Sequence, residues 1–246
     1  MLELKNIGFA VPETADGEAK EIIKDVSLKI EDGRFLVITG PNGGGKSTLA
    51  KLIMGIEKPT KGSMIFNGQD ITGLDITERA KLGIGYAFQQ PPRFKGMTVR
   101  HLLSLAAGEE LPEDECCSYL TGVGLCSMDY LNREVDSSLS GGEVKRIEIA
   151  TLMARKPKIS IYDEPEAGID LWSFSMLVES FKMLTRERHE SVIIISHQER
   201  IMQLADDIAV IADGVIRSYG PKEQILPSLI GEFDRKCGLR GEKEGE

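Results

Sequence analysis

A glycine-rich stretch carries the clearest chemical signal in the chain. It reads Gly40-Pro41-Asn42-Gly43-Gly44-Gly45-Lys46-Ser47-Thr48. Glycines let consecutive backbone N–H groups curl around phosphate oxygens, and the start of a following helix adds a favourable dipole. Lys46 can reach the same oxygens, and the Ser47 hydroxyl can hold Mg²⁺. A flexible glycine turn is the alternative, but the position between a strand and a helix predicts a nucleoside triphosphate site.

Two later apolar segments end in residues that can handle phosphate chemistry. Asp163 and Glu164 follow a short run beginning at Ile159. Asp163 can complete a Mg²⁺ shell, and Glu164 can orient and deprotonate a water molecule. His197 follows the run Ser191–Ile195 and can contact a γ-phosphate, although a lone histidine usually carries little weight.

Two further motifs are weaker when taken singly. Gln89 ends the apolar stretch 83–89, where it can coordinate Mg²⁺ and the attacking water or be an ordinary surface amide. Ser140, Gly141 and Gly142 precede an amphipathic helix predicted over 144–153. They can bind an anion or form an ordinary helix N-cap with a glycine turn.

The elements that position these residues alternate between strands and helices. A buried parallel strand is predicted at 35–39 before the glycine loop, and a helix at 48–54 after it. Other expected elements are a strand at 2–9, a turn or exposed loop at 11–21, a strand at 22–30 and a hairpin around 63–68. Phe9 lies on the first strand, either under a nucleotide base or, as strand aromatics more often do, in the core.

The middle of the chain changes character. After Pro91 and Pro92, residues 97–131 show helical periodicity, several acids and no β-branched run, which predicts a helical insertion. Its acidic run, 109–115, indicates a solvated helix edge or, alternatively, a surface that docks a partner.

Composition limits the class of protein. With 246 residues, of which 41% are hydrophobic, the chain can form one large domain with a buried core. A net charge of −9 argues against a nucleic-acid partner. No leader peptide or apolar membrane span is present, which predicts a cytoplasmic protein without direct membrane insertion. The cysteines, at positions 116, 117, 126 and 237, lack a C-x-x-C spacing, so incidental reduced thiols are favoured over a metal role.

The order of these motifs resembles that of the ATP-binding-cassette (ABC) ATPases, and the resemblance covers essentially the whole chain. It implies these roles: Walker A for Gly40–Thr48, Q-loop for Gln89, signature for Leu139–Glu143, Walker B for Asp163, catalytic base for Glu164, D-loop for Ala167–Asp170 and switch for His197. The implied cofactors are ATP and Mg²⁺. The implied assembly is an ATP-dependent homodimer in which ATP on one chain's Walker A meets the other chain's signature.

The same resemblance implies an α/β fold. This is the P-loop NTPase ABC cassette, with a RecA-like, mainly parallel sheet core, an N-terminal antiparallel β subdomain and a helical subdomain. Within a single domain spanning 1–246, the nucleotide-binding core and β subdomain would take 1–90 and 157–230. The helical signature subdomain would take 91–156, and a tail 231–246.

Residues around the signature indicate a particular subgroup of the ABC ATPases. Glu143 replaces the usual glutamine and leads into Val144-Lys145-Arg146-Ile147-Glu148-Ile149, and the switch segment continues to Arg200-Ile201. Both details are similar to the SufC family, the soluble cassette ATPases of iron–sulfur cluster assembly. That likeness implies a SufB/SufD-like scaffold partner docking near 89–100, with the cluster ligands on the partner.

Other details oppose this assignment. Glu164-Pro165-Glu166 is closer to the transporter pattern, and Trp172 just after the D-loop is unusual. The alternative is therefore the ATP-binding subunit of a membrane ABC transporter, with a permease as partner. A chromosome-maintenance cassette would need a long coiled coil between the Walker A and signature motifs, and the sequence has none.

Overall fold

The computed structural model describes residues 1–12, 19–187 and 190–230. The strands are β1 (Leu2–Pro12), β2 (Ala19–Ile30), β3 (Phe35–Thr39), β4 (Lys61–Phe66), β5 (Gln69–Asp70), β6 (Ile84–Ala87), β7 (Phe94–Thr98), β8 (Glu134–Val135), β9 (Ile159–Asp163), β10 (Ser191–Ile195), β11 (Asp207–Ala212) and β12 (Val215–Pro221). The helices are α1 (Lys46–Met54), α2 (Ile76–Leu82), α3 (Val99–Ala107), α4 (Glu113–Gly122), α5 (Ser127–Tyr130), α6 (Gly141–Arg155), α7 (Leu171–Glu187) and α8 (Glu199–Met202). His189, Cys237 and the expected tail at 231–246 lie outside the described residues.

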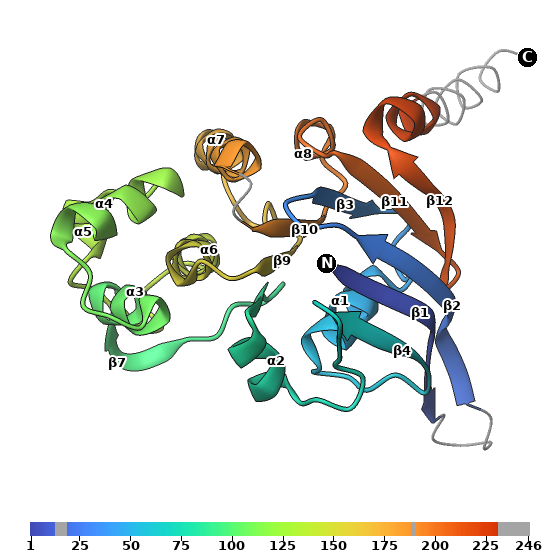
Figure 1. Cartoon of the computed structure of the whole chain (residues 1–246). Helices are drawn as coiled ribbons and strands as arrows, with labels where there is room; N and C mark the ends of the chain where they lie inside the picture. Colours follow the sequence, from blue (N-terminus) through green and yellow to red (C-terminus); the bar gives the residue numbers. More distant parts are fainter. Residues whose placement is uncertain (13–18, 188–189, 231–246) are drawn as a thin grey trace, which may run out of the picture.

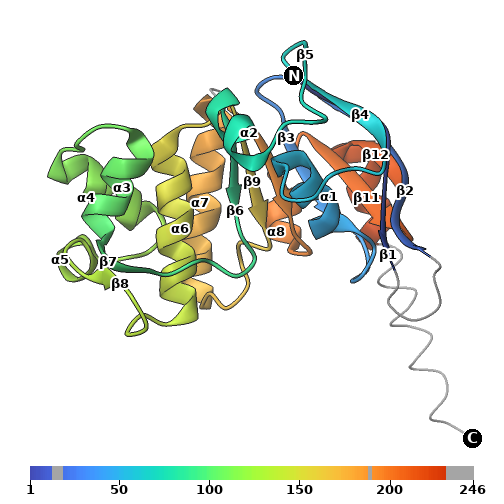
Figure 2. The ribbon, with the colours of Figure 1, turned by 90° about the horizontal axis from the view of Figure 1, so that it is seen from below.

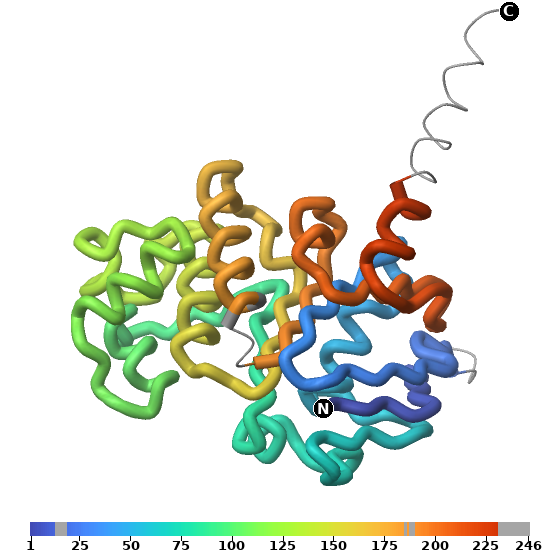
Figure 3. The backbone as a smooth tube through the Cα atoms, turned by 45° about the horizontal axis from the view of Figure 1, so that its top comes forward, coloured from blue at the N-terminus to red at the C-terminus, as the bar shows by residue number. Residues whose placement is uncertain are grey.

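One large sheet organises the described chain. Its strand order is β5-β4-β1-β2-β12-β11-β3-β10-β9-β6. The strands from β11 through β3, β10 and β9 to β6 pair in parallel, whereas β1, β2, β4 and β5 pair antiparallel. The predicted parallel core with antiparallel N-terminal strands is confirmed. In Figure 3 the blue N-terminal segment lies beside the red C-terminal segment, because β2 pairs with β12.

Helices cover both faces of the parallel strands, so the sheet has two apolar cores. Alternate side chains of β3 point to opposite faces of the sheet and so join different cores. Phe35 and Val37 join a core with α3, α4, α6 and α7, while Leu36 and Ile38 join a second core with α1. In Figure 1, α7 and α8 lie above the central strands and α1 and α2 below them. Burial on both faces explains why these strands are apolar throughout.

A helical region extends from one end of the sheet. Helices α3, α4 and α5 lie together at the left of Figure 2, and α6 and α7 run side by side between them and the strands. Among the described residues, no helix is long and apolar enough to cross a membrane.

The first two strands are longer than the sequence predicts. Residues 11–12 and 19–21, expected in a loop, extend the β1–β2 ladder, with Val11 opposite Lys20 and Pro12 opposite Ala19. The side chains there are exposed, so the burial pattern of a half-buried strand is missing. The rest of the expected loop, 13–18, lies outside the described residues.

Two other boundaries differ from prediction. Strand β6 ends at Ala87, two residues before Gln89, because the Phe88 N–H donates to the Glu148 side chain instead of continuing the ladder. The helical insertion begins with a strand, β7, which pairs with β8. Its last residue, Thr98, caps α3 by accepting a hydrogen bond from the His101 N–H.

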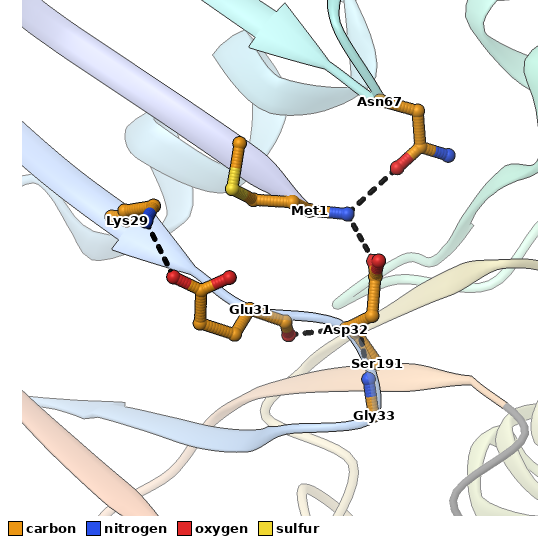
Figure 4. A network of polar contacts seen from close by, with 7 residues as sticks. All are labelled: Met1, Lys29, Glu31, Asp32, Gly33, Asn67 and Ser191. Carbon is orange, nitrogen blue, oxygen red and sulfur yellow. Dashed lines mark hydrogen bonds and ion pairs between the residues drawn. The ribbon is translucent and has the colours of Figure 1, made fainter.

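A polar network fixes the turn that enters β3 (Figure 4). The Met1 ammonium pairs with Asp32 and lies 2.7 Å from the Asn67 side-chain oxygen, which ties β1 to this turn and to the β4–β5 hairpin. The Ser191 hydroxyl accepts from the Gly33 N–H and donates to the Glu31 carbonyl. The turn is thus anchored to β10, the strand beside β3.

Candidate functional site

The glycine loop joins the end of β3 to the start of α1, as the sequence predicts. Two of its glycines are required by close backbone packing. Gly40 has φ +130°, and a Cβ there would lie 2.1 Å from the Ile211 carbonyl oxygen. Gly45 has φ +102°, and its Cβ would lie 2.6 Å from a methyl carbon of Ile23. A side chain at Gly40 would displace the backbone of β11, one at Gly45 would push the Ile23 side chain aside, and the positive φ at both positions disfavours residues other than glycine.

Lys46, the first residue of α1, is 5% exposed. Its Nζ donates to the Gly40 oxygen at 2.7 Å and to the Pro41 oxygen at 2.9 Å, so the ammonium lies inside the loop. Burial lowers the pKa of Lys46, while Glu164 and Asp163 nearby oppose this shift. The cation is therefore positioned where anionic oxygens would stabilise it.

Asp163, at the end of β9, accepts two side-chain hydrogen bonds. The Ser47 hydroxyl donates to Oδ1 at 3.0 Å, and the Tyr86 hydroxyl donates to Oδ2 at 2.9 Å. Burial, followed by the Asp163 charge, raises the pKa of Tyr86, so this phenol stays a donor. Sequence reasoning missed Tyr86, although a tyrosine within a buried strand needs a partner for its hydroxyl.

Glu164, the residue after Asp163, contacts Gln89. The Gln89 Nε2 donates to Glu164 Oε2 at 2.8 Å. Glu164 has φ +47°, a strained conformation for a residue other than glycine, and its N–H donates to the Ile195 oxygen. Strain of this kind persists only where surrounding contacts enforce it, and it is concentrated at functional sites.

His197 comes two residues after the end of β10 and is exposed. Neighbouring protein atoms, followed by the Lys46 charge, lower the pKa of its imidazole, and Glu164 opposes that shift. The shift favours the neutral imidazole, and His197 belongs electrostatically to the same group as Lys46 and Glu164.

A cavity of about 600 Å³ is lined by Lys46, Ser47, Gln89 and Glu164 of this group, but not by Asp163, Tyr86 or His197. Its lining comes from the glycine loop, β2 and the turn after β11: Lys20, Glu21, Ile22, Lys24, Asn42, Gly43, Gly45, Lys46, Ser47, Thr48, Gln89, Glu164, Asp213 and Gly214. Phe9 is not part of this lining and packs against an apolar core, as strand aromatics usually do.

The Ser-Gly-Gly segment lies outside that cavity, at the start of α6. Ser140 is the N-cap, and its hydroxyl accepts from the Glu143 N–H while Glu143 accepts from the Ser140 N–H. Glu143 also accepts from the Tyr130 hydroxyl, which, together with these bonds, lowers its pKa to about 2. Within one chain, the structure does not bring Ser140, Gly141 and Gly142 to the glycine loop.

Two residues of α6 that sequence reasoning did not single out for a site hold Gln89 in place. Lys145 is 1% exposed and donates to the Phe88, Gln89 and Asp163 carbonyl oxygens. Glu148 accepts from the Phe88 N–H at 2.9 Å. We call Lys145 and Glu148 the α6 brace. A charged pair three residues apart on a buried helix was the available sequence signal.

Glu148 of the α6 brace also lines an apolar groove of about 400 Å³. Its walls come from β6, β7, α3 and α6: Tyr86, Phe88, Pro92, Phe94, Met97, Leu102, Leu105, Ala106, Val135, Val144, Ile147, Glu148, Thr151, Leu152 and Arg155. Burial raises the pKa of Glu148 to about 7. The groove overlaps 89–100, where the sequence predicts a docking surface.

The donor set fits a magnesium nucleotide better than a metal held by protein alone. No group of three or more His, Cys, Asp or Glu side chains in the described ranges could hold a metal ion. Ser47 and Asp163 instead offer one hydroxyl and one carboxylate beside a phosphate-binding loop. Mg²⁺ is commonly bound by one or two carboxylates together with substrate phosphates.

Comparison with known proteins decides the family. The family model described as ABC transporter matches residues 23–167. This chain belongs to the ABC transporter ATP-binding family. It is 43% identical to the Uncharacterized ABC transporter ATP-binding protein MJ0035 of Methanocaldococcus jannaschii, over 89% of each chain. It is 34% identical to the Sulfate/thiosulfate import ATP-binding protein CysA of a Synechocystis strain, over 86% of this chain and 59% of that protein.

A solved structure extends the likeness to the fold. The dimeric post-hydrolysis structure of the ATP-binding cassette MJ0796, bound to ADP and Pi, is 25% identical, with a TM-score of 0.80 over 90% of this chain and 99% of that one. The cassette is an ABC-type ATPase with the P-loop NTPase fold, which confirms both predictions. None of these three names mentions iron–sulfur cluster assembly, so the SufC assignment stays a prediction.

Proposed function

We propose that this cassette hydrolyses ATP at the site where Ser47, Asp163, Glu164 and Gln89 converge on the glycine loop. The observation that carries the proposal is the pair of contacts from Ser47 to Asp163 and from Gln89 to Glu164. These contacts support a metal-binding role for Ser47 and Asp163, and a role for Glu164 and Gln89 as base and orienting residue. Glu164 would take a proton from the attacking water while Gln89 orients it.

The remaining site residues would stabilise phosphate charge. The backbone of Gly40–Thr48 would surround the β- and γ-phosphates, Lys46 would pair with their oxygens, and neutral His197 would hydrogen-bond the γ-phosphate. Ser47, Asp163 and Gln89 would hold Mg²⁺, which would supply positive charge to neutralise the phosphate oxygens.

The signature would act on a second chain. Ser140, Gly141 and Gly142 do not line the chain's own nucleotide cavity, so in a head-to-tail homodimer they would reach the nucleotide bound by the partner. The dimeric state of the MJ0796 cassette supports this arrangement. ATP would then close the dimer, and loss of phosphate would reopen it.

ATP hydrolysis by the cassette would change the conformation of a partner protein docked in the apolar groove. The names of the relatives favour a membrane permease, which would make the chain the ATP-binding subunit of a transporter on the cytoplasmic side. A SufB/SufD-like scaffold is the second candidate. The observation that favours it is the sequence of segment 143–149, which is similar to that of the SufC family.

Capture of the partner would decide between these candidates. Tagged protein would be purified from its native cells twice, anaerobically without detergent and from detergent-solubilised membranes. A polytopic membrane protein that copurifies only with detergent would indicate a transporter, and a soluble partner carrying iron and sulfide would indicate cluster assembly. Phe94→Ala in the groove should weaken capture about 10-fold, whereas Tyr219→Ala, a similarly exposed aromatic on β12, should not. Equal capture by both variants would place docking elsewhere.

A further inference from the structure

Two large apolar side chains lie exposed at the start of α7. Leu171 is 71% exposed and Trp172 is 84% exposed. They directly follow the D-loop, Ala167–Asp170. A monomer leaves neighbouring large apolar side chains in water mainly where another molecule covers them. Neither residue contributes to the nucleotide cavity or to the apolar groove.

The backbone under this pair is held firmly. Asp170 Oδ1 accepts from the Trp172 N–H at 3.1 Å and from the Ser173 N–H at 2.9 Å, which caps the helix. Arg200 reaches back from α8, donating to the Ser175 hydroxyl at 3.1 Å and lying over the Phe174 ring. The two apolar side chains are therefore presented on a fixed helix start, not on a loose loop.

The start of α7 touches the start of α6, where the signature lies. The Arg146 guanidinium donates to the Ser173 hydroxyl at 2.5 Å and to the Gly124 oxygen at 2.9 Å. A Cβ on Gly142 would come within 2.5 Å of the Gly168 oxygen, so the signature and the D-loop are in contact. Helices α6 and α7 run side by side in Figure 2. The pair therefore belongs to the surface that carries the signature.

We propose that Trp172, supported by Leu171, is an apolar anchor buried by a second copy of this chain when ATP closes the dimer. This inference rests on the proposed head-to-tail function. A signature loop that reaches the partner's nucleotide must bring the adjoining helix start close to that partner. Aromatic residues are enriched among interface hot spots, because they bury large area at small entropic cost. Loss of such an anchor typically weakens association on the order of 30-fold.

Trp172 is the only tryptophan in the chain, so its fluorescence reports on this surface alone. Glu164→Gln, in which ATP should persist, would be measured with and without Mg-ATP. Tryptophan emission and acrylamide quenching would be recorded alongside sedimentation velocity. We expect that ATP produces a dimer, shifts the emission to shorter wavelength and reduces quenching severalfold.

The outcomes separate this inference from the proposed function. A dimer in which Trp172 remains as quenchable as in the monomer would overturn the proposal that Trp172 is an anchor. The head-to-tail proposal would remain intact, and Leu171 and Trp172 would then be available to bind a different partner. No dimer at all would overturn both. Protection of Trp172 in the dimer would support both.

Substitutions of Trp172 give a second, independent test of the anchor. In the Glu164→Gln background, Trp172→Ala should raise the dimer dissociation constant on the order of 30-fold, and Trp172→Phe should retain most of the affinity. Ile76→Ala removes an exposed apolar side chain from α2, which lies on the opposite side of the central strands from α7 in Figure 1, and should have no effect. Unchanged dimerisation of Trp172→Ala, with normal thermal unfolding, would contradict the anchor.

Discussion

The glycine-loop cavity and the signature surface are both proposed to bind phosphate, but they differ in how far one chain already satisfies their polar groups. In the cavity, Lys46 and Asp163 already have protein partners for their charges. At the signature, Ser140 caps the third N–H of α6 and leaves those of Gly141 and Gly142 without a helical partner. The first region is organised before ligand arrives, whereas the second has donors ready for a ligand held elsewhere.

Burial explains why the two regions differ. Leaving a buried polar group unpaired costs about 1–3 kcal/mol, so the buried cavity residues must be satisfied internally. Ser140 and Gly141 are exposed, and water can satisfy free N–H groups there at little cost. We therefore expect ATP hydrolysis to depend on the cavity and dimer formation to depend on the signature surface. Substitutions in each region can test this difference.

The largest effect is expected from damage to the cavity's chemistry. Glu164→Gln should lower kcat about 10²–10⁴-fold, because it removes the base while keeping the side chain's shape. ATP affinity should change little, since the phosphate contacts of Lys46 and the loop remain. Steady-state hydrolysis and equilibrium binding of a fluorescent ATP analogue would be measured together. Undiminished hydrolysis would exclude Glu164 as the base.

A mixing experiment tests whether the two regions work in different chains. Lys46→Ala should abolish ATP binding by its own chain, and Ser140→Arg should block the signature. In a 1:1 mixture, half of the dimers combine both variants and carry one intact composite site. About a quarter of wild-type activity should therefore return. If the mixture is as inactive as its components, each site must be built within a single chain.

The α6 brace is the link between the two regions, and its loss should have a moderate effect. Lys145→Met keeps the length of the stem but removes the donor to the carbonyls of Phe88, Gln89 and Asp163. We expect kcat to fall about 10-fold and the Mg²⁺ concentration for half-maximal rate to rise, with ATP affinity in the absence of Mg²⁺ unchanged.

Amide exchange distinguishes positioning from simple destabilisation of the fold. The Phe88 N–H donates to Glu148, so Glu148→Ala should speed its exchange. Glu148→Gln keeps an acceptor oxygen and should preserve both protection and rate. Equal exchange in these two variants would show that Glu148 does not hold Phe88.

Local sequence predicted the elements that bear motifs better than the contacts between them. The strands before Gly40, Glu164 and Ser196 were predicted because each is a short, mostly apolar run. Tyr86, Lys145 and Glu148 were missed as site residues because their roles depend on partners 18 to 77 positions away in the chain. Such pairing follows from the packing of α6 on β6 and β9, which no local pattern encodes.

The smallest effect is expected at the signature surface itself, where Tyr130 donates to Glu143. The pKa of Glu143 is about 2, below its ordinary 4.5, so this contact stabilises the fold fully above pH 4.5 and less as pH falls towards 2. Tyr130→Phe should lower the unfolding temperature about 1–3 °C at pH 7, because the pair is largely solvent-screened. Calorimetry at pH 7 and pH 3 should show a smaller difference between variant and wild type at the lower pH. A difference that grows on acidification would mean that Tyr130 stabilises something other than the Glu143 carboxylate.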